Sequence, residues 1–248
     1  KFSIQQPMIR NYTWELYFAD VAKRSGLLTL DMGLIDFYVN GESRGIYSYE
    51  ELPQKETVEK NMRKNGPIFG LDEPLGVSFP DVFFEVYEED YWKTDGIALY
   101  SVAVQKLASL YTFSDVESPG KQPLGNVFDL VQWAKFFALT ELFGAYHGAF
   151  LKSVKLYFNP TTGLFEPLVF DAHIGAGEYK SLFLLDYVFK NGEVDCYPGC
   201  DDNEWFRLFF NSGNKEFLNI YRNELALVAS NESVIKLRGN YDKNFSII

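Results

Sequence analysis

The residues with the clearest chemical potential are the two histidines of the chain and an aspartate close to the second. His147 and His173 are the only histidines among 248 residues, and Asp171 lies two positions before His173. Imidazole nitrogens and carboxylate oxygens bind transition metals, so the three side chains could form a metal site if the fold brings them together. Alternatively, His147 could accept a proton, because the unperturbed pKa of histidine is about 6.5. A structural role also stays open, with His147 at a helix end and His173 bonded to the backbone.

Asp171 is the stronger functional candidate because of what surrounds it in the sequence. It follows the apolar run Pro167–Phe170, and an aspartate after such a run usually lies at the end of a strand. Two glycines just beyond, Gly175 and Gly177, give the backbone room to approach a ligand. We therefore expect Asp171 at a strand end, facing a ligand.

The elements that would position these residues are a helix and a hairpin. Residues 126–143 carry apolar side chains at helical spacing on nearly one whole face, which predicts a core helix ending shortly before His147. A hairpin should follow, with strands at Ser153–Phe158 and Leu164–Phe170 joined by the turn Asn159–Gly163. No Gly-x-Ser-x-Gly elbow accompanies them, so a serine hydrolase is not indicated.

The rest of the chain predicts strands first and helices later. We expect a strand at Phe2–Gln5, a helix through Arg24 stopped by Gly26, and a hairpin of Gly33–Val39 and Gly45–Tyr49 around Asn40-Gly41. Helices are predicted at residues 54–65, 97–111 and 203–230, the last interrupted at 211–214. This order favours a segregated α+β layout over a doubly wound sheet.

Composition and charge limit the possible partners. The net charge of −11 argues against nucleic acid, which is bound through basic patches. The longest apolar runs fall far short of the roughly 20 residues that span a bilayer, so no membrane span is expected. Aromatic residues make up 17% of the chain, and most of them should form the core.

The two cysteines provide evidence on the cellular compartment of the protein. Cys196 and Cys200 flank a Pro-Gly turn that could bring their thiols within bridging distance. A disulfide would fit an extracytoplasmic protein. Two unpaired thiols in a loop would not indicate any compartment. The first residue is Lys1 rather than Met, so we interpret the chain as a mature or trimmed fragment.

Three segments together resemble the family of spore coat protein H (CotH), which has a kinase-like fold. The first is Phe2–Tyr12 with the helix after it, and the second is Phe37–Glu51, an apolar strand, an Asn-Gly turn, Gly-Ile-Tyr and an acidic end. The third is Leu156–Gly163, followed by Phe170–His173 where the family has Trp-Asp-x-Asp. Their order and spacing cover most of residues 1–180.

The resemblance implies one α+β domain over residues 1–248 with the two-lobed fold of protein kinases. A small β-rich N-terminal lobe, truncated at its start, would occupy residues 1–75. A larger, mainly helical C-terminal lobe would occupy residues 76–248, with a β-hairpin near 153–170.

The resemblance also implies ATP and a divalent metal, Mg²⁺ or Mn²⁺, as cofactors. It assigns metal binding to Asp171, with His173 in place of the family's second aspartate and Ser153 or Lys152 in place of its asparagine. The family's catalytic aspartate falls on Gly148, so the neighbouring His147 would act with Asp171 in catalysis.

For the nucleotide, the resemblance offers Lys1 and Glu51. The family's cation on the first strand corresponds to Lys1, or to a position now held by Ser3 or Gln5. Glu51 would lie near the nucleotide or pair with a cation such as Arg10 or Lys55.

Two functions follow from the resemblance. The first is an atypical protein kinase that phosphorylates an extracytoplasmic protein, whether secreted, on the cell surface or in the spore coat. The second is a pseudokinase, inactive as a catalyst, that serves as a binding or coat-assembly module. The replaced catalytic residues favour the second, and the sequence gives no indication of the oligomeric state.

Overall fold

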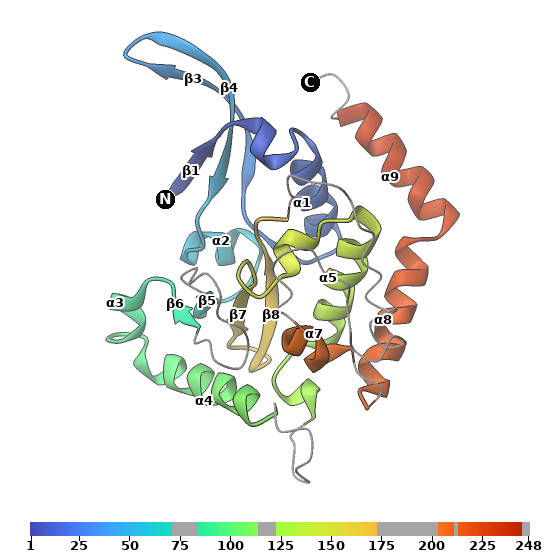
Figure 1. Ribbon diagram of the computed structural model, residues 1–248. Coiled ribbons are helices and arrows are strands. Elements are labelled where there is room, and N and C mark those ends of the chain that lie inside the picture. Colours follow the sequence, from blue (N-terminus) through green and yellow to red (C-terminus); the bar gives the residue numbers. More distant parts are fainter. Residues whose placement is uncertain (71–83, 114–122, 173–202, 211–212, 245–248) are drawn as a thin grey trace.

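The computed structural model describes residues 1–70, 84–113, 123–172, 203–210 and 213–244 (Figure 1). The first part of the chain forms a three-stranded antiparallel sheet in the order β1-β4-β3. Its strands are β1 (Phe2–Gln5), β3 (Met32–Val39) and β4 (Glu42–Glu51). Between β1 and β3 the chain forms the short 3-10 helix η1 (Pro7–Arg10) and helix α1 (Trp14–Arg24). The predicted strand, helix and hairpin are all present.

The hairpin of β3 and β4 forms where the sequence predicted it. Asn40 and Gly41 both have positive φ, 52° and 82°, which suits a two-residue turn with the twist of a hairpin. Strand β4 runs longer than expected at both ends. Its first residues pair with β3 up to the turn, with Val39 opposite Glu42, and its far end also pairs with β1, from Phe2 opposite Glu51 to Gln5 opposite Ser48. The hairpin projects from the body of the molecule (Figure 1).

A second sheet mixes strands from distant parts of the chain. Its order is β2-β8-β7-β5-β6, formed by β2 (Leu28–Thr29), β5 (Ile68–Gly70), β6 (Glu85–Val86), β7 (Lys155–Asn159) and β8 (Leu164–Val169). All neighbouring pairs are antiparallel except β2 with β8. Strands from residues 28–70 thus pair directly with the predicted second hairpin, and the α+β class is confirmed with two sheets.

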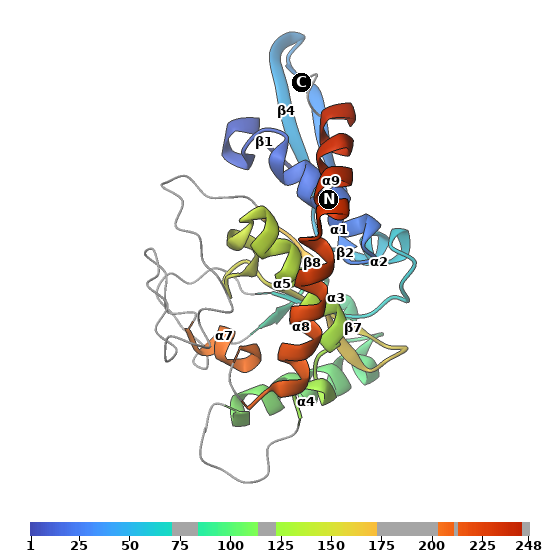
Figure 2. The same ribbon diagram turned by 90° about the vertical axis from the view of Figure 1, so that its right-hand side faces the viewer.

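The core is built on helix α5 (Leu130–Phe143). Trp133 is fully buried there, with its indole Nε1 donating to the Phe165 carbonyl at 2.9 Å. Helix α8 (Lys215–Val228) packs against α5, and α9 (Asn231–Asn244) continues along the same side of the molecule (Figure 2). The dense aromatic residues are mainly core, as predicted; Trp133 and Phe209, for example, lie 5.1 Å apart between ring centroids.

The remaining helices are shorter or less central. They are α2 (Lys55–Lys60), α3 (Glu89–Trp92), α4 (Ile97–Phe113), α7 (Asn203–Phe209) and the 3-10 segments η2 (Leu124–Asn126) and η3 (Tyr146–Ala149). Helix α5 begins four residues later than predicted, because Phe128 first makes a bridge to Phe165 and Asp129 then caps the helix by accepting from the Gln132 amide. Helix α9 was not predicted.

The prediction of a helix over residues 54–65 was wrong beyond Lys60. Asn61 ends α2, and its side chain bonds to the Thr29 backbone, donating to the carbonyl at 2.9 Å and accepting from the amide at 3.3 Å. Met62 then takes a positive φ of 56°, which turns the chain towards the second sheet. Tertiary hydrogen bonds therefore outweigh the local helical preference here.

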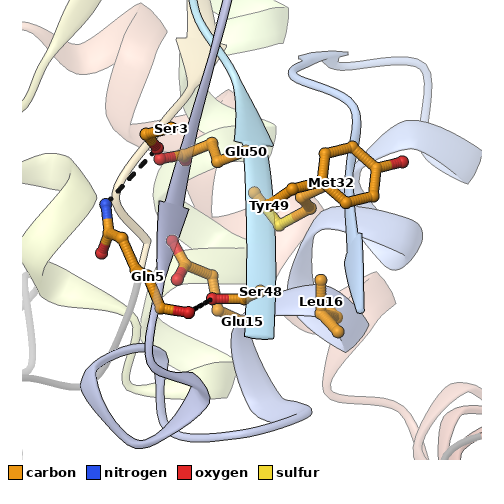
Figure 3. Close-up of a pocket in the computed structure, with 8 residues that line it drawn as sticks. All are labelled: Ser3, Gln5, Glu15, Leu16, Met32, Ser48, Tyr49 and Glu50. Atoms are coloured by element: carbon orange, nitrogen blue, oxygen red, sulfur yellow. Dashed lines mark hydrogen bonds between the residues drawn. The ribbon is translucent and has the colours of Figure 1, made fainter. Parts of the chain in front are cut away.

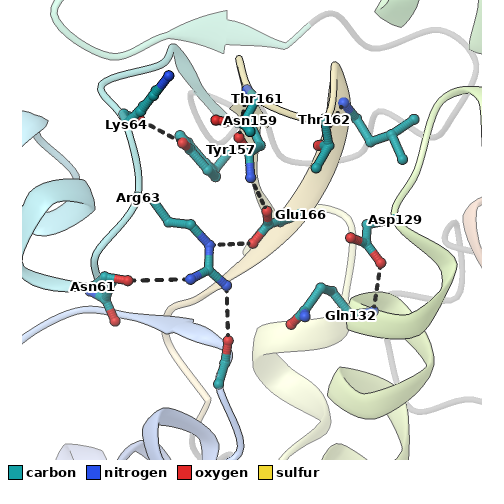
Figure 4. A network of polar contacts seen from close by, with 12 residues as sticks. Asn61, Arg63, Lys64, Asp129, Gln132, Tyr157, Asn159, Thr161, Thr162 and Glu166 are labelled. Carbon is teal, nitrogen blue, oxygen red and sulfur yellow. Dashed lines mark hydrogen bonds and ion pairs between the residues drawn. The ribbon is translucent and has the colours of Figure 1, made fainter.

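A buried ion pair fixes the chain after α2 to the second sheet (Figure 4). The Arg63 guanidinium donates to the Glu166 carboxylate at 3.0 Å, and the Glu166 side chain is only 4% exposed. Arg63 also donates to the carbonyls of Asn61 and Gly26, while Asn159 donates to the other oxygen of Glu166. One guanidinium thus joins the ends of α1 and α2 to strand β8.

Candidate functional site

Three of the predicted site residues meet where the β7–β8 hairpin lies against the end of α5. Gly144 ends α5 in a left-handed conformation, with φ 64°, and the chain then forms η3, which carries His147. Ser153 lies in the turn before β7, held by hydrogen bonds from its amide and the next one to the Phe150 carbonyl. Asp171 follows β8 by two residues, as the sequence predicted.

The contacts among the three side chains centre on one carboxylate oxygen. His147 Nδ1 lies 2.8 Å from Asp171 Oδ2 and 3.2 Å from the Asp171 carbonyl oxygen. The Ser153 hydroxyl donates to the same Oδ2 at 3.1 Å and lies 3.4 Å from His147 Nδ1. The side chains of His147 and Asp171 are 22% and 13% exposed, and Ser153 is buried. The cluster is therefore held close to, but not sealed from, solvent.

These contacts assign the histidine tautomer. Two oxygens of Asp171 lie near His147 Nδ1. The backbone carbonyl oxygen can only accept a hydrogen bond, and the carboxylate Oδ2 accepts when it is ionised, so Nδ1 carries the proton. In a neutral ring Nε2 then bears the lone pair, and any proton-accepting role of His147 would use Nε2. Because Ser153 and Asp171 share one ring nitrogen, the geometry differs from a hydrolase triad, in which histidine bridges the two through opposite nitrogens.

Comparison with protein families identifies the chain. A family model described as CotH kinase protein matches residues 8–231. The chain belongs to the CotH kinase protein family. No curated protein matches the sequence.

The position that CotH resemblance gives to the catalytic aspartate is closed by packing. A Cβ atom on Gly148 would lie 2.5 Å from the Phe170 carbonyl oxygen, closer than real Cβ atoms approach another atom, and 3.0 Å from the Ala172 Cα. The absent side chain at 148 allows η3 to lie directly on the backbone that carries Asp171. In this conformation only glycine fits.

Asp171 itself has an unusual backbone conformation. Its φ is +52°, in the left-handed region that residues other than glycine adopt infrequently. Such conformations cost of order 1 kcal/mol or more and gather at functional sites, where the surrounding structure holds them in place. Here the contacts with His147 and Ser153 supply that restraint.

Lys1 and Glu51 are linked to one another through Gln54. The Gln54 side chain donates to Glu51 at 3.0 Å and accepts from the Lys1 amino terminus at 2.9 Å. Glu51 is buried, and its ionic contact is with Lys60, at 3.2 Å. Among the described side chains, the cation paired with Glu51 is Lys60, whereas Lys55 contacts Glu59. The side chain of Arg10, the other expected partner, lies outside those that the structure describes.

Sequence reasoning missed two buried carboxylates between α1 and the first sheet (Figure 3). Glu15 on α1 and Glu50 on β4 are 2% and 5% exposed, and both line a small pocket with Ser3, Gln5 and Ser48. Glu50 could have been found, because strand alternation places it on the face of Ser48. Glu15 carries no comparable signal, since a glutamate in a first helical turn is usually explained by the helix dipole.

Several predicted features fall outside the described residues, namely His173 and the cysteines Cys196 and Cys200. Within the described part of the chain, no group of three His, Cys, Asp or Glu side chains could hold a metal ion. The same residues include no helix long and apolar enough to cross a membrane.

The cluster of His147, Ser153 and Asp171 offers two oxygen donors to a metal ion, the Asp171 carboxylate and the Ser153 hydroxyl.

This donor set suits magnesium better than a transition metal. Magnesium prefers hard oxygen ligands and is commonly held by one or two carboxylates, with phosphates and waters completing its shell. A serine or threonine hydroxyl and an aspartate share this task in one large class of nucleotide-binding enzymes. Asp171 and Ser153 therefore fit the ion that CotH membership implies.

Proposed function

We propose that the chain is a CotH-type atypical protein kinase domain, two-lobed, that binds ATP with a divalent metal and phosphorylates hydroxyl groups of an extracytoplasmic protein. The observation that carries this proposal is the meeting of His147, Ser153 and Asp171 from three separate segments around a strained aspartate. A backbone conformation of this kind, held in place by its surroundings, is typical of functional sites.

Each residue of the cluster has a chemical role in this proposal. Asp171 and Ser153 would hold the metal, and His173 is a further candidate ligand. The metal, when bound, neutralises charge on the transferring phosphoryl group. His147 would orient the Asp171 carboxylate through Nδ1 and accept the proton of the substrate hydroxyl through Nε2, in place of the aspartate that Gly148 cannot supply.

The nucleotide would lie between this cluster and the first sheet. In protein kinases, a strand lysine pairs with a glutamate of the helix that follows. Glu15 on α1 is the candidate for that glutamate, and Ser3 and Gln5 occupy its pocket where a lysine would be expected. Lys1 precedes them on the same strand face, since alternate residues share a face. We therefore retain Lys1 as a proposed nucleotide contact. Glu51 lies on the opposite face of the sheet from Ser3 and Glu50, and we retain it as a proposed contact on the family resemblance alone.

The second candidate is a pseudokinase domain that binds a partner in a surface or coat assembly without catalysis. The observation in its favour is Gly148, because the closed backbone there leaves no space for an acidic side chain. The kinase must bind nucleotide and transfer phosphate, whereas the pseudokinase transfers none and is not required to bind nucleotide. Binding must therefore be tested first, and turnover second.

The first experiment is thermal unfolding with ATP and either magnesium or manganese. Ligand at 100 times its dissociation constant stabilises a folded protein by about 2.7 kcal/mol. For a domain of this size that corresponds to a rise in Tm of roughly 5–10 °C. Asp171→Asn should abolish the rise, whereas Asp36→Asn, which makes the same change on an exposed residue of β3, should retain it.

The results separate the candidates. A metal-dependent rise lost only in Asp171→Asn supports the nucleotide site, and transfer of radiolabelled phosphate to the chain itself or to a basic model protein then supports the kinase. Binding without transfer favours the pseudokinase. No rise at millimolar nucleotide would overturn the kinase proposal and leave the second candidate, a pseudokinase that serves as a binding module, as the better account.

A further inference from the structure

One buried charge has no part in the function proposed above, the ammonium of Lys155 at the start of β7. Among the side chains that the structure describes, Lys155 is the only buried lysine or arginine, with 3% of its surface exposed. Lysine is rarely buried, because its ammonium is strongly hydrated. Lys155 lies two residues after Ser153, so a buried cation is placed beside the cluster of His147, Ser153 and Asp171.

A glycine and two aromatic rings surround the Lys155 side chain. Its Nζ lies 4.6 Å from the centroid of the Phe170 ring and 6.0 Å from that of Tyr87, distances at which a ring face attracts a cation. Gly70, the last residue of β5, leaves the space for this side chain, because a Cβ there would lie 2.8 Å from Lys155 Cδ and 3.1 Å from Nζ. The position of the ammonium is therefore specified by its neighbours.

The side chain of Lys155 lies on the face of the second sheet that is turned away from α5. In β7, Leu156 and Phe158 pack in the core around α5, and successive residues of a strand point to opposite faces. The Phe170 ring packs against the smaller apolar cluster on the other face. Because Phe170 directly precedes Asp171, the ammonium that contacts its ring lies near the proposed metal ligand.

We propose that Lys155 binds the phosphate groups of the nucleotide, an inference that rests on the nucleotide site proposed above. Enzymes of phosphoryl transfer hold the phosphates with a cationic side chain as well as with the metal. In the pocket beside the first strand, Ser3 and Gln5 occupy the place where that lysine would be expected, and Lys1 is exposed. The Lys155 ammonium is shielded from water, which strengthens its attraction for a phosphate near the metal that Asp171 would hold.

The first test compares ATP with adenosine, because only ATP carries the phosphates. In isothermal titration calorimetry of the whole chain with magnesium, Lys155→Met should weaken ATP binding about tenfold or more, the usual size of a hydrogen bond to a charged group. The same variant should leave the affinity for adenosine unchanged, whereas a merely structural role of Lys155 would weaken both ligands together. Lys93→Met, which removes an exposed lysine, should change neither affinity.

A second measurement does not depend on the folding of a variant. An ATP derivative that carries an acyl group on its terminal phosphate reacts with a lysine beside the phosphates. The amine attacks the acyl carbon, an amide forms and the nucleotide leaves through its phosphate oxygen. Mass spectrometry of peptides from the wild-type chain should find the acyl group on Lys155, and excess ATP should suppress this labelling.

The outcomes distinguish this inference from the function on which it rests. Three results would overturn the role of Lys155 and leave the kinase proposal in place, provided that Asp171→Asn still abolishes ATP binding. They are ATP binding that Lys155→Met leaves intact, an equal loss of ATP and adenosine in that variant, and labelling of Lys1 without labelling of Lys155. A wild-type chain that binds no ATP would overturn both proposals.

Discussion

Replacing Gly148 by alanine is the most direct test of the closed packing behind Asp171. The added methyl group would lie 2.5 Å from the Phe170 carbonyl oxygen, 3.0 Å from the Ala172 Cα and 3.2 Å from the Ala172 Cβ. Two of these neighbours are backbone atoms, which cannot turn aside as a flexible side chain can. Either η3 or the end of β8 must move.

The cost of that movement can be estimated. Forcing extra methyl groups into well-packed sites typically destabilises a protein by about 1–3 kcal/mol. For a domain of this size, each kcal/mol lowers Tm by roughly 2–4 °C, so Gly148→Ala should melt about 2–12 °C below the wild-type protein. Differential scanning calorimetry without ligand measures the effect, so the outcome does not depend on any assumed activity.

A matched control makes the reasoning refutable. Gly239, within α9, has no atom within 4 Å of the position a Cβ would take. Gly239→Ala should therefore stabilise the helix by about 0.5–1 kcal/mol, as alanine does in place of a helical glycine. If Gly148→Ala unfolds at or above the wild-type temperature while Gly239→Ala behaves as expected, the close approach of η3 to Phe170 is refuted.

Three further predictions concern stability. Arg63→Met should cost about 3–5 kcal/mol because it leaves the buried Glu166 carboxylate without its cation, and adding Glu166→Gln should recover much of that loss in urea unfolding. Phe137→Ala should cost about 3–5 kcal/mol in the same assay, since the side chain is fully buried among aromatic rings. The hydrogen bond and charge of Lys60 lower the pKa of Asp31, so this pair stabilises the fold above pH ~4, the ordinary aspartate pKa, and less as pH falls below it. Asp31→Asn, which leaves the contact between Lys60 and Glu51 in place, should therefore remove less than about 1 kcal/mol at pH 7 and progressively less as the pH falls below ~4, measured by thermal unfolding across pH.

The sequence was informative wherever local chemistry determines structure. The Asn40-Gly41 turn predicted the first hairpin, and helical spacing predicted α5, because both signals act over a few residues. The sequence could not predict that β2 pairs in parallel with β8, since that contact joins residues 28–29 to 168–169 and depends on packing of the whole domain. The early end of α2 has the same cause, because Asn61 bonds to Thr29.

In the candidate site, too, some features could be predicted from the sequence and others depend on tertiary packing. Asp171 and His147 stood out by residue type and by their place beside predicted elements, and family resemblance added Ser153. Their mutual contacts depend on the end of β8 and on η3 coming together, which no local pattern encodes. Glu15 was missed because its burial follows from the packing of α1 on the first sheet and not from its neighbours in sequence.

The residues that differ from the family pattern lie close to one another in the structure. His147, Gly148 and Ser153 all contact, or allow contact with, the segment that carries Asp171. A mostly buried carboxylate without hydrogen-bond donors would strongly destabilise the fold, so the fold requires donors to Asp171 whether or not the site is active. Here two donors meet one oxygen of Asp171, and a glycine gives them the room to do so. Under the proposed kinase function, this arrangement would be a site rebuilt around Asp171, with His147 near the position that an aspartate would hold. Phosphate transfer is the measurement that distinguishes this site from a pseudokinase.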